Sequence, residues 1–267
     1  TGIAPRELML GLTIATIIGV PLANAIGQLV GWRWGFALVG ALGVTTVVLL
    51  ALYAPKDRPV PGASPLRELS ALGQRQVWLT LGIGAIGFGG MFCVYTYLAS
   101  TMMEVTGVAP ATVPLALAVF GVGLTVGNLA GAWAADRALM PSVGGILLWS
   151  ALSLALFTFA VDDLWSVMVT VFMIGCGGGL GTALQTRLMD VARDAQTLAA
   201  ALNHSAFNFA NALGPWLGGL AIAGGHGWAS TGWVGSALAL GGFVIWMLAL
   251  LDDRQRERAL VAQQACG

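Results

Sequence analysis

Residues 113–135 read VPLALAVFGVGLTVGNLAGAWAA, twenty-three consecutive residues without Asp, Glu, Lys or Arg. A helix needs about 20 mostly apolar residues to cross the hydrocarbon core of a bilayer, so this run predicts a transmembrane helix. Seven further runs with charge-free cores lie at approximately 8–30, 34–54, 77–101, 143–161, 164–186, 198–223 and 228–251. The sequence therefore predicts an all-α polytopic membrane protein with eight transmembrane helices.

The composition of the whole chain agrees with a lipid environment. Only 9% of the 267 residues are charged and 57% are hydrophobic, with a mean hydropathy of +0.84. A soluble domain carries about 25% charged residues, so a soluble protein is excluded. The net charge is zero, which excludes the basic surface of a nucleic-acid binder. Cys93, Cys176 and Cys266 show neither a CxxC motif nor metal-ligand spacing, so we expect no metal and no cofactor.

The basic residues indicate the orientation in the membrane. If the N-terminus is cytoplasmic, the cytoplasmic segments hold eleven of the twelve, namely Arg6, Lys56, Arg58, Arg67, Arg75, Arg137, Arg187, Arg193, Arg254, Arg256 and Arg258. The opposite side keeps only Arg33, together with the acidic Glu104, Asp162 and Asp163. Cytoplasmic loops are enriched in Lys and Arg, so we expect both termini in the cytoplasm.

Polar segments between the apolar runs divide the chain into four parts. Residues 1–54 hold a first helix pair, and residues 55–76, with four prolines and six charges, form a linker. Residues 77–251 hold six helices, and residues 252–267 form a cytoplasmic tail. The acidic pairs Asp162-Asp163 and Asp252-Asp253 are expected to be solvated, because neither has a His or further acids nearby.

Small residues recur at every fourth position of several predicted helices. Residues 113–135 carry Gly123, Gly127 and Gly131, and residues 198–223 carry Gly214 and Gly218 in the same way. This spacing lets two backbones approach closely, either in static packing or in a sliding contact. Two glycines stand close to interior prolines, as Gly19 with Pro21 and Gly214 with Pro215. A proline inside a helix bends it, and in a transporter such a bend can act as a hinge.

Neutral polar residues are the remaining candidates for function inside the membrane. His204, Asn208 and Asn211 fall at i, i+4 and i+7, so they share one face of a helix. Further polar side chains on the predicted helices are Asn24, Gln28, Tyr95, Thr96, Tyr97, Asn128 and Gln185. An amide is costly in hydrocarbon unless it is bonded or hydrated, so these groups either join helices or line a wet cavity. We call His204, Asn208 and Asn211 the polar stripe, and for this stripe we favour the second interpretation, the lining of a wet cavity.

A histidine switch and a membrane enzyme are two further functions that this composition could support. His204 is a possible protonation switch, although an interfacial histidine needs no function. A rhomboid-like protease would need a Gly-x-Ser-Gly motif, and a polyprenyl-handling enzyme would need a DDxxD-like arrangement, and the sequence contains neither. We therefore expect no enzyme and, with similar weight, no channel.

Several motifs resemble those of the major facilitator superfamily exporters. They are Phe88-Gly89-Gly90-Met91-Phe92, Gly127-Asn128-Leu129-Ala130-Gly131 with Ala135-Asp136-Arg137, Leu184-Gln185-Thr186-Arg187, Asn203-His204-Ser205-Ala206-Phe207-Asn208 and Asn211-Ala212-Leu213-Gly214-Pro215. The nearest subgroup is the drug:proton antiporter type, similar to arabinose efflux permeases. The resemblance implies a twelve-helix fold of which helices 5–12 are present. It also assigns a cytoplasmic gating role to Gly131, Asp136 and Arg137.

The chain also departs from the family pattern. Ala23 stands where a Gly is usual, Ser100 stands for Pro, Ala132 stands for Gly, and Ala138-Leu139-Met140 replaces a basic end. Helices 1–4 have no counterpart and residue 1 is Thr, which is typical of a fragment or a truncated product. The resemblance implies that the acidic and basic residues of helices 1 and 4, which the family uses for proton coupling and for recognition of substrate charge, are missing from this chain.

The resemblance leads to one function and one alternative. The function is proton-coupled efflux of small organic molecules across the bacterial inner membrane by alternating access, in a monomer. The substrate path would run along Tyr95, Tyr97, Asn128, Gln185, Asn208 and Asn211, and the hinges would lie at Gly19, Pro21, Gly214 and Pro215. The alternative is a membrane remnant that inserts but does not transport.

Overall fold

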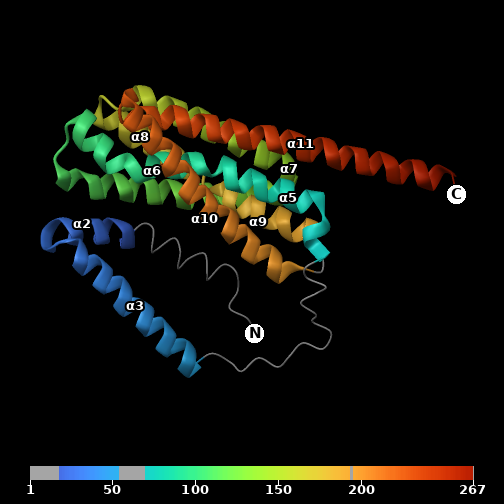
Figure 1. The fold of residues 1–267 in the computed structure, drawn as a ribbon, viewed down its shortest axis with the longest axis horizontal. Coiled ribbons are helices and arrows are strands. Elements are labelled where there is room, and N and C mark those ends of the chain that lie inside the picture. Colours follow the sequence, from blue (N-terminus) through green and yellow to red (C-terminus); the bar gives the residue numbers. More distant parts are fainter. Residues whose placement is uncertain (1–17, 54–69, 193–194, 267) are drawn as a thin grey trace.

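The structure is a computed structural model that describes residues 18–53, 70–192 and 195–266, and these residues form helices and short turns without a strand (Figure 1). The first helices, α2 (Val20–Val30) and α3 (Trp32–Tyr53), form a hairpin. Gly31 joins them with a φ of 100°, a conformation that favours glycine. The beginning of the predicted helix 8–30, residues 8–17, lies outside the described residues.

A long interrupted helix begins within the last residues of the expected linker 55–76. The short 3₁₀ turn η2 (Ser70–Gly73) leads into α5 (Arg75–Gly82), the π-helical turn η3 (Ile83–Gly87), α6 (Gly89–Thr101) and a second π-helical turn, η4 (Met102–Thr106). Together α5 to η4 correspond to the helix expected at 77–101. The first π-helical turn falls on a glycine-rich stretch and the second ends the rod at Thr106.

The longest element is α7 (Val113–Ala160), which starts after the 3₁₀ turn η5 (Pro110–Thr112). It contains both helices expected at 113–135 and 143–161, separated at Ala138, where φ is −155° and ψ is 82°. Ala134 of the first arm and Gly145 of the second line one groove, so the chain reverses between them. The Thr106 hydroxyl at the end of η4 donates a hydrogen bond to the Val161 carbonyl oxygen at 2.7 Å, so the end of the second arm lies beside the end of η4.

The remaining elements complete the bundle. They are α8 (Leu164–Cys176), α9 (Gly179–Ala192), α10 (Gln196–Ala221), the π-helical turn η6 (Ile222–His226) and α11 (Ser230–Cys266). The turn at Gly177-Gly178 separates α8 from α9, inside the helix expected at 164–186.

Five stretches of the described chain are long and apolar enough to cross a membrane, namely Trp32–Tyr53, Arg75–Thr106, Pro110–Ala160, Leu164–Ala192 and Ser230–Arg256. The chain is thus an integral membrane protein, and the count of eight crossings stays a prediction. Two features account for part of the difference between these five stretches and the eight expected helices. The helix α7 contains two expected spans, and α10 carries Asn203, His204 and Asn208, which lower its hydropathy.

The hydrophobic core lies within α5 to α11. Phe157, Leu98 and Met102 are buried almost completely in one cluster, to which α6, α7, α8, α9, α10 and α11 all contribute. By contrast, α3 has no buried residue. Figure 1 shows α2 beside one end of the bundle and α3 leading away from it. Burial therefore separates the α2–α3 hairpin from the six predicted helices that follow.

Glycine–backbone contacts join the helices of the bundle. A Cβ on Gly127 would lie 2.1 Å from the carbonyl oxygen of Cys176, so α7 and α8 touch through their backbones. A Cβ on Gly214 would lie 2.0 Å from the carbonyl oxygen of Gly89, which joins α10 to α6 in the same way. The predicted close packing along 113–135 and 198–223 is present, whereas a Cβ on Gly19 or Gly27 of the first helix would meet nothing within 4 Å.

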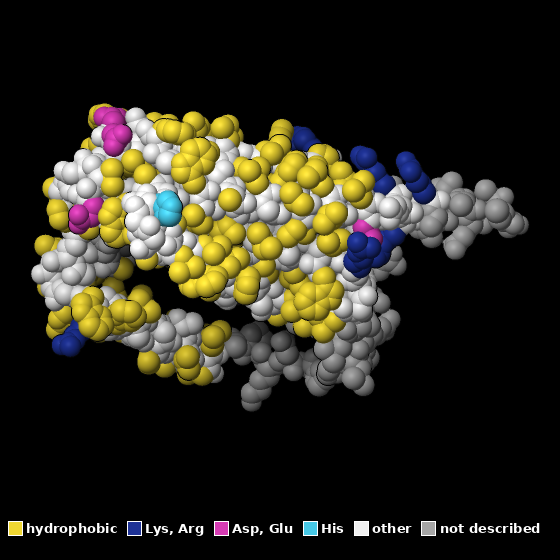
Figure 2. Space-filling view, turned by 45° about the horizontal axis from the view of Figure 1, so that its top comes forward, with side chains coloured by type: hydrophobic (Ala, Val, Ile, Leu, Met, Phe, Trp, Pro, Cys, Tyr) yellow, Lys and Arg dark blue, Asp and Glu magenta, His cyan; other side chains and the backbone are white. Residues whose placement is uncertain are grey.

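The arginines of the bundle gather at one end, where Asp252 and Asp253 pair with three of them and Asp136 precedes Arg137. Figure 2 shows Lys and Arg side chains gathered where α11 leaves the bundle and acidic side chains at the other end. We call these the basic end (Arg75, Arg137, Arg187, Arg254 and Arg256) and the acidic end (Glu104, Asp162 and Asp163). At the acidic end, the backbone N–H of Ser166 donates to Asp163 at 2.9 Å, which caps α8 and lowers the pKa of that carboxyl.

The expectation of a solvated tail from residue 252 is wrong at its first residue. Asp252 is 8% exposed, pairs with Arg75 at 3.3 Å and Arg256 at 2.9 Å, and accepts a hydrogen bond from Gln76 at 2.8 Å. Asp253 pairs with Arg187 of α9. Helix α11 continues through this cluster to Cys266, because the acidic pair finds its basic partners on α5 and α9.

Candidate functional site

A cavity of about 430 Å³ lies where α2 meets the bundle. Its polar wall consists of Tyr95 and Thr96 on α6, Asn211 on α10 and Asn24 on α2. Its apolar lining consists of Ala23, Phe92, Ala99 and Leu117. The cavity thus brings four helices, far apart in the sequence, to one space.

Tyr95 provides the aromatic wall of this cavity. Its ring lies 4.6 Å from the ring of Phe120 on α7, centroid to centroid, at an interplanar angle of 36°. A half-buried tyrosine presents a flat apolar ring and one hydroxyl, which suits an amphipathic organic molecule.

Asn211 belongs to an open polar face of α10. Asn211, Asn208 and His204 are all exposed, as their helical spacing predicted for a stripe on one face. In the described part of the chain, neither amide has a side-chain hydrogen bond to another helix. The stripe therefore does not join helices of this bundle, and only Asn211 reaches the cavity.

Hydrogen bonds of Gln28 fix α2 at the cavity. The Gln28 side-chain amide donates to Asn24 Oδ1 at 2.7 Å and to the carbonyl oxygen of Pro110 at 3.1 Å. Pro110 begins the turn η5 in front of α7, so this bond ties the hairpin to the bundle. As a consequence, the Asn24 amide is oriented along the wall of the cavity.

The other residues predicted for the substrate path lie elsewhere. The Tyr97 hydroxyl donates to the Pro215 carbonyl oxygen at 2.9 Å and so joins α6 to α10. Asn128 on α7 and Gln185 on α9 are half-buried and line no part of the cavity. For these three and for Asn208, a role in the path stays a prediction.

The predicted hinge and gate residues are distributed over both ends of the bundle. Pro21 lies at the start of α2 and Pro215 inside α10. A Cβ on Gly131 would lie 2.7 Å from Gly179, so this residue serves close packing. Asp136 is exposed, and Arg137 holds its guanidinium over the ring of Trp133 at 3.7 Å.

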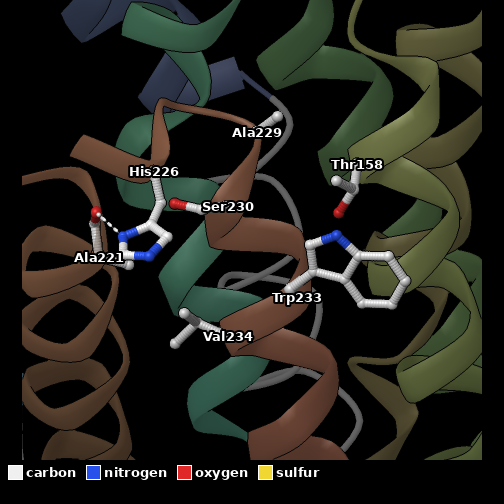
Figure 3. A pocket seen from close by; sticks show the side chains of 7 residues that line it. All are labelled: Thr158, Ala221, His226, Ala229, Ser230, Trp233 and Val234. Atoms are coloured by element: carbon white, nitrogen blue, oxygen red, sulfur yellow. Dashed lines mark hydrogen bonds between the residues drawn. The ribbon is translucent and has the colours of Figure 1, made fainter. Parts of the chain in front are cut away.

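A second pocket of about 450 Å³ lies between η6, the start of α11 and the second arm of α7 (Figure 3). His226 and Trp233 flank it, and the Nδ1 atom of His226 lies 3.2 Å from the Ala221 carbonyl oxygen. Its volume is similar to that of the cavity at α2, yet none of the predicted site residues lines it. We therefore place the candidate site at the α2 cavity.

The side chains that line the candidate site are suited to binding a small molecule. Amide, hydroxyl and aromatic groups line it, and none of its lining residues is ionisable at neutral pH. The described residues contain no group of three His, Cys, Asp or Glu side chains able to hold a metal. Such a lining can bind a small neutral or amphipathic molecule but offers no nucleophile or acid–base pair.

Sequence reasoning missed half of the lining. Of the eight lining residues, only Tyr95 and Asn211 were predicted for the substrate path. Asn24 and Thr96 were identified only as polar residues within predicted helices. Phe92, Ala99 and Leu117 carried no signal, because apolar residues are the background of a membrane helix. The Gln28–Pro110 bond joins residues 82 positions apart and has no sequence signature.

Comparisons with known proteins identify the family. The model of the Major Facilitator Superfamily matches residues 80–265. The inner membrane transport protein YdhP of Escherichia coli is 31% identical over 260 residues, which cover 97% of this chain and 66% of that protein.

Two further relatives have similar coverage. The uncharacterized MFS-type transporter YtbD of Bacillus subtilis is 30% identical over 93% of this chain and 64% of its own length. A probable sugar efflux transporter of Helicobacter pylori is 30% identical over 89% of this chain and 63% of its own length. The chain thus spans slightly less than two thirds of the relatives it matches, and it belongs to the major facilitator superfamily.

Proposed function

We propose that this chain forms the last two thirds of a proton-coupled exporter of small organic molecules, of the drug:proton antiporter subgroup. Residues 1–54 would be the last helix pair of the N-terminal bundle and 55–76 the linker. Residues 77–251 would be the C-terminal six-helix bundle, followed by a cytoplasmic tail at 252–267. The whole transporter would rock its two bundles about a central site in the inner membrane.

The cavity at α2 carries this proposal. It lies between the hairpin that we assign to one bundle and the six helices that we assign to the other, which is where a transporter of this design binds its substrate. Tyr95 and Asn211 line it from the bundle and Asn24 lines it from the hairpin. The probable sugar efflux transporter among the relatives supports a polar organic substrate.

The test uses the whole transporter in membrane vesicles with a proton gradient. We expect accumulation of a substrate that a protonophore abolishes. Asn211→Ala should change the ratio of the rates for a sugar and for a lipophilic cation, because it removes one polar contact from the cavity. Thr46→Ala, on the exposed face of α3, is the matched control and should leave the ratio unchanged.

Each component of the proposal has its own contrary result. An equal loss for every substrate, together with a lower melting temperature, would mean that Asn211 supports the fold rather than the path. Accumulation that the protonophore leaves intact would exclude proton coupling. If the whole transporter accumulated none of the tested compounds, the non-transporting alternative would stand.

A further inference from the structure

A groove of about 390 Å³ runs between the two arms of α7 and the end of α8, apart from the candidate site. Val126, Ala130 and Trp133 line it from the first arm, Gly145 and Trp149 from the second, and Cys176 from α8. Its volume lies within the range of about 300–1,000 Å³ of small-molecule pockets.

The groove opens on the outer surface of an apolar helix. Trp133 is 60% exposed and Trp149 is 41% exposed, on a helix long and apolar enough to span the membrane. The Trp149 indole N–H donates to the Met173 carbonyl oxygen of α8 at 2.9 Å, which fixes this wall. At membrane depth, a fixed apolar groove that opens outward is a surface for a hydrocarbon chain.

One end of the groove carries a positioned cation. Arg137 follows Trp133 by one helical turn, and its guanidinium lies 3.7 Å from the centroid of the Trp133 ring. One of its N–H groups donates to the Trp133 carbonyl oxygen at 3.1 Å. Among the ion pairs of the described residues none includes Arg137, so its other N–H groups face outward without a carboxylate. A guanidinium in this setting can bind a phosphate through two N–H groups.

From these features we propose that the groove binds an anionic phospholipid, with one acyl chain between Trp133 and Trp149 and the headgroup phosphate on Arg137. Arg137 belongs to the basic end of the bundle, which favours an anionic occupant, and the neighbouring carboxylate of Asp136 forms no ion pair with it among the described residues. Basic residues just outside a membrane span attract anionic headgroups. The bound lipid contacts both arms of α7 across the break at Ala138, and it is a ligand distinct from the transported substrate.

Two adjacent glycines allow a direct test of the acyl-chain position. A Cβ on Gly145 would meet nothing within 4 Å, so the side chain of Gly145→Leu extends into the groove. A Cβ on Gly144 would lie 2.6 Å from the Trp246 ring, so that neighbour belongs to the core and is left unchanged. The matched control is Ala237→Leu, which adds the same side chain on the exposed face of α11.

The measurement is the number of lipids retained by the purified protein in native mass spectrometry, from bilayers of phosphatidylglycerol and phosphatidylcholine. The unmodified protein should retain phosphatidylglycerol in preference. Arg137→Gln should lower that retention about fivefold, the factor that corresponds to about 1 kcal/mol per basic residue at the surface. Arg258→Gln, an exposed position farther along α11, should have little effect.

Gly145→Leu should lower the retention of both lipids, and Ala237→Leu should not. If Gly145→Leu does not yield folded protein, Val126→Trp fills the same groove from a position that is 44% exposed. An equal loss of phosphatidylglycerol retention in Arg137→Gln and Arg258→Gln would mean that the lipid is attracted diffusely to the basic surface and does not bind at this site. Unchanged retention in the folded groove-filling variant would overturn the proposal.

Cys176 supplies an independent readout within the groove. It is partly accessible, whereas Cys93 is fully buried. With Cys266 replaced by Ser, an apolar maleimide should label Cys176 more slowly in phosphatidylglycerol than in phosphatidylcholine. Arg137→Gln should remove that difference, and a difference that persists in Arg137→Gln would contradict the headgroup assignment.

Discussion

The hydroxyl of Tyr97 on α6 donates a hydrogen bond to the carbonyl oxygen of Pro215 on α10, at 2.9 Å. The Tyr97 ring fits where α10 has two adjacent glycines, since a Cβ on Gly219 would lie 2.7 Å from the Tyr97 hydroxyl oxygen. Pro215 lies inside α10, and the tyrosine bonds the backbone carbonyl oxygen of that proline. Tyr97 therefore joins two helices, although the neighbouring Tyr95 lines the cavity.

Tyr97→Phe tests this joining role. The change removes the hydroxyl and keeps the ring, so it should lower the free energy of unfolding by about 0.6 kcal/mol, an average value for an interhelical hydrogen bond in a membrane. Substrate preference should stay as in the unmodified transporter. A thermal melt in detergent and a comparison of two substrates check both points, and altered preference without a change in melting would return Tyr97 to the path.

The contact between Gly214 and Gly89 gives the second prediction. A methyl group on Gly214 would lie 2.0 Å from the Gly89 carbonyl oxygen, so Gly214→Ala must push α10 away from α6. Overpacking of this kind costs about 1–3 kcal/mol. Gly40→Ala on α3, where a Cβ would meet nothing within 4 Å, is the control and should not destabilise the protein. Equal melting temperatures for both variants would mean that the two helices separate freely.

The ion pair between Arg187 and Asp253 gives the third prediction. Their side chains are 15% and 27% exposed, and the Nε atom of Arg187 is buried without a partner in the described structure. Loss of one partner of a buried pair costs about 3–5 kcal/mol, so Arg187→Gln should lower stability by a value near the bottom of that range.

A more exposed arginine of the same cluster provides the comparison. Arg256 is 51% exposed and pairs with Asp252 one helical turn away, a geometry worth only about 0.3–0.5 kcal/mol. Arg256→Gln should therefore shift the melting temperature much less than Arg187→Gln. Similar shifts for the two variants would show that the pair with Asp253 is solvated in the membrane-embedded protein.

Particular residues show what sequence alone can predict here. The run at 113–135 fixed a membrane helix with glycines on one face, because apolar length and fourfold spacing are local properties. The acidic pair Asp252-Asp253 looked solvated, because its partners Arg75, Gln76 and Arg187 lie more than sixty positions away. Which helix end meets which depends on long-range packing, and a single sequence does not display it.

The same limit applies to the candidate site. The sequence does not distinguish Tyr95 from Tyr97, because both are tyrosines in the same apolar helix. Side chains two positions apart in a helix point in directions about 200° apart around its axis. One ring consequently faces the cavity and the other faces α10. Asn211 was identifiable because an amide in an apolar run is costly, whereas Phe92 and Leu117 were not.

The orientation in the membrane gives the fourth prediction. Because the basic residues gather at one end of the bundle, we expect that end to face the cytoplasm. Fusions of alkaline phosphatase and a fluorescent protein after Arg58, Gly107, Asp163 and Arg254 should report inside, outside, outside and inside. Phosphatase activity of the fusion after Arg254 would reverse the assignment of the C-terminus.

The last prediction concerns Asp136 beside the break in α7. The family resemblance assigns this carboxylate to a closed cytoplasmic gate, held by the N–H groups at the start of the helix expected at 8–30, which lies outside the described residues. In the structure Asp136 is exposed and has no ion pair among the described residues, so it is available for such a contact. A carboxylate at a helix N-terminus gains about 0.3–1 kcal/mol when exposed and up to about 2 kcal/mol when partly buried. Since 1.4 kcal/mol corresponds to a factor of ten, the contact can shift a two-state gate several-fold.

Asp136→Asn in the whole transporter should therefore speed the labelling of a cysteine placed at Thr96, inside the cavity, by a reagent added from the cytoplasmic side. Ser142→Ala, on the other side of the break, controls for local disturbance of the turn. Identical labelling rates for Asp136→Asn and the unmodified gate would make Asp136 a solvated surface acid.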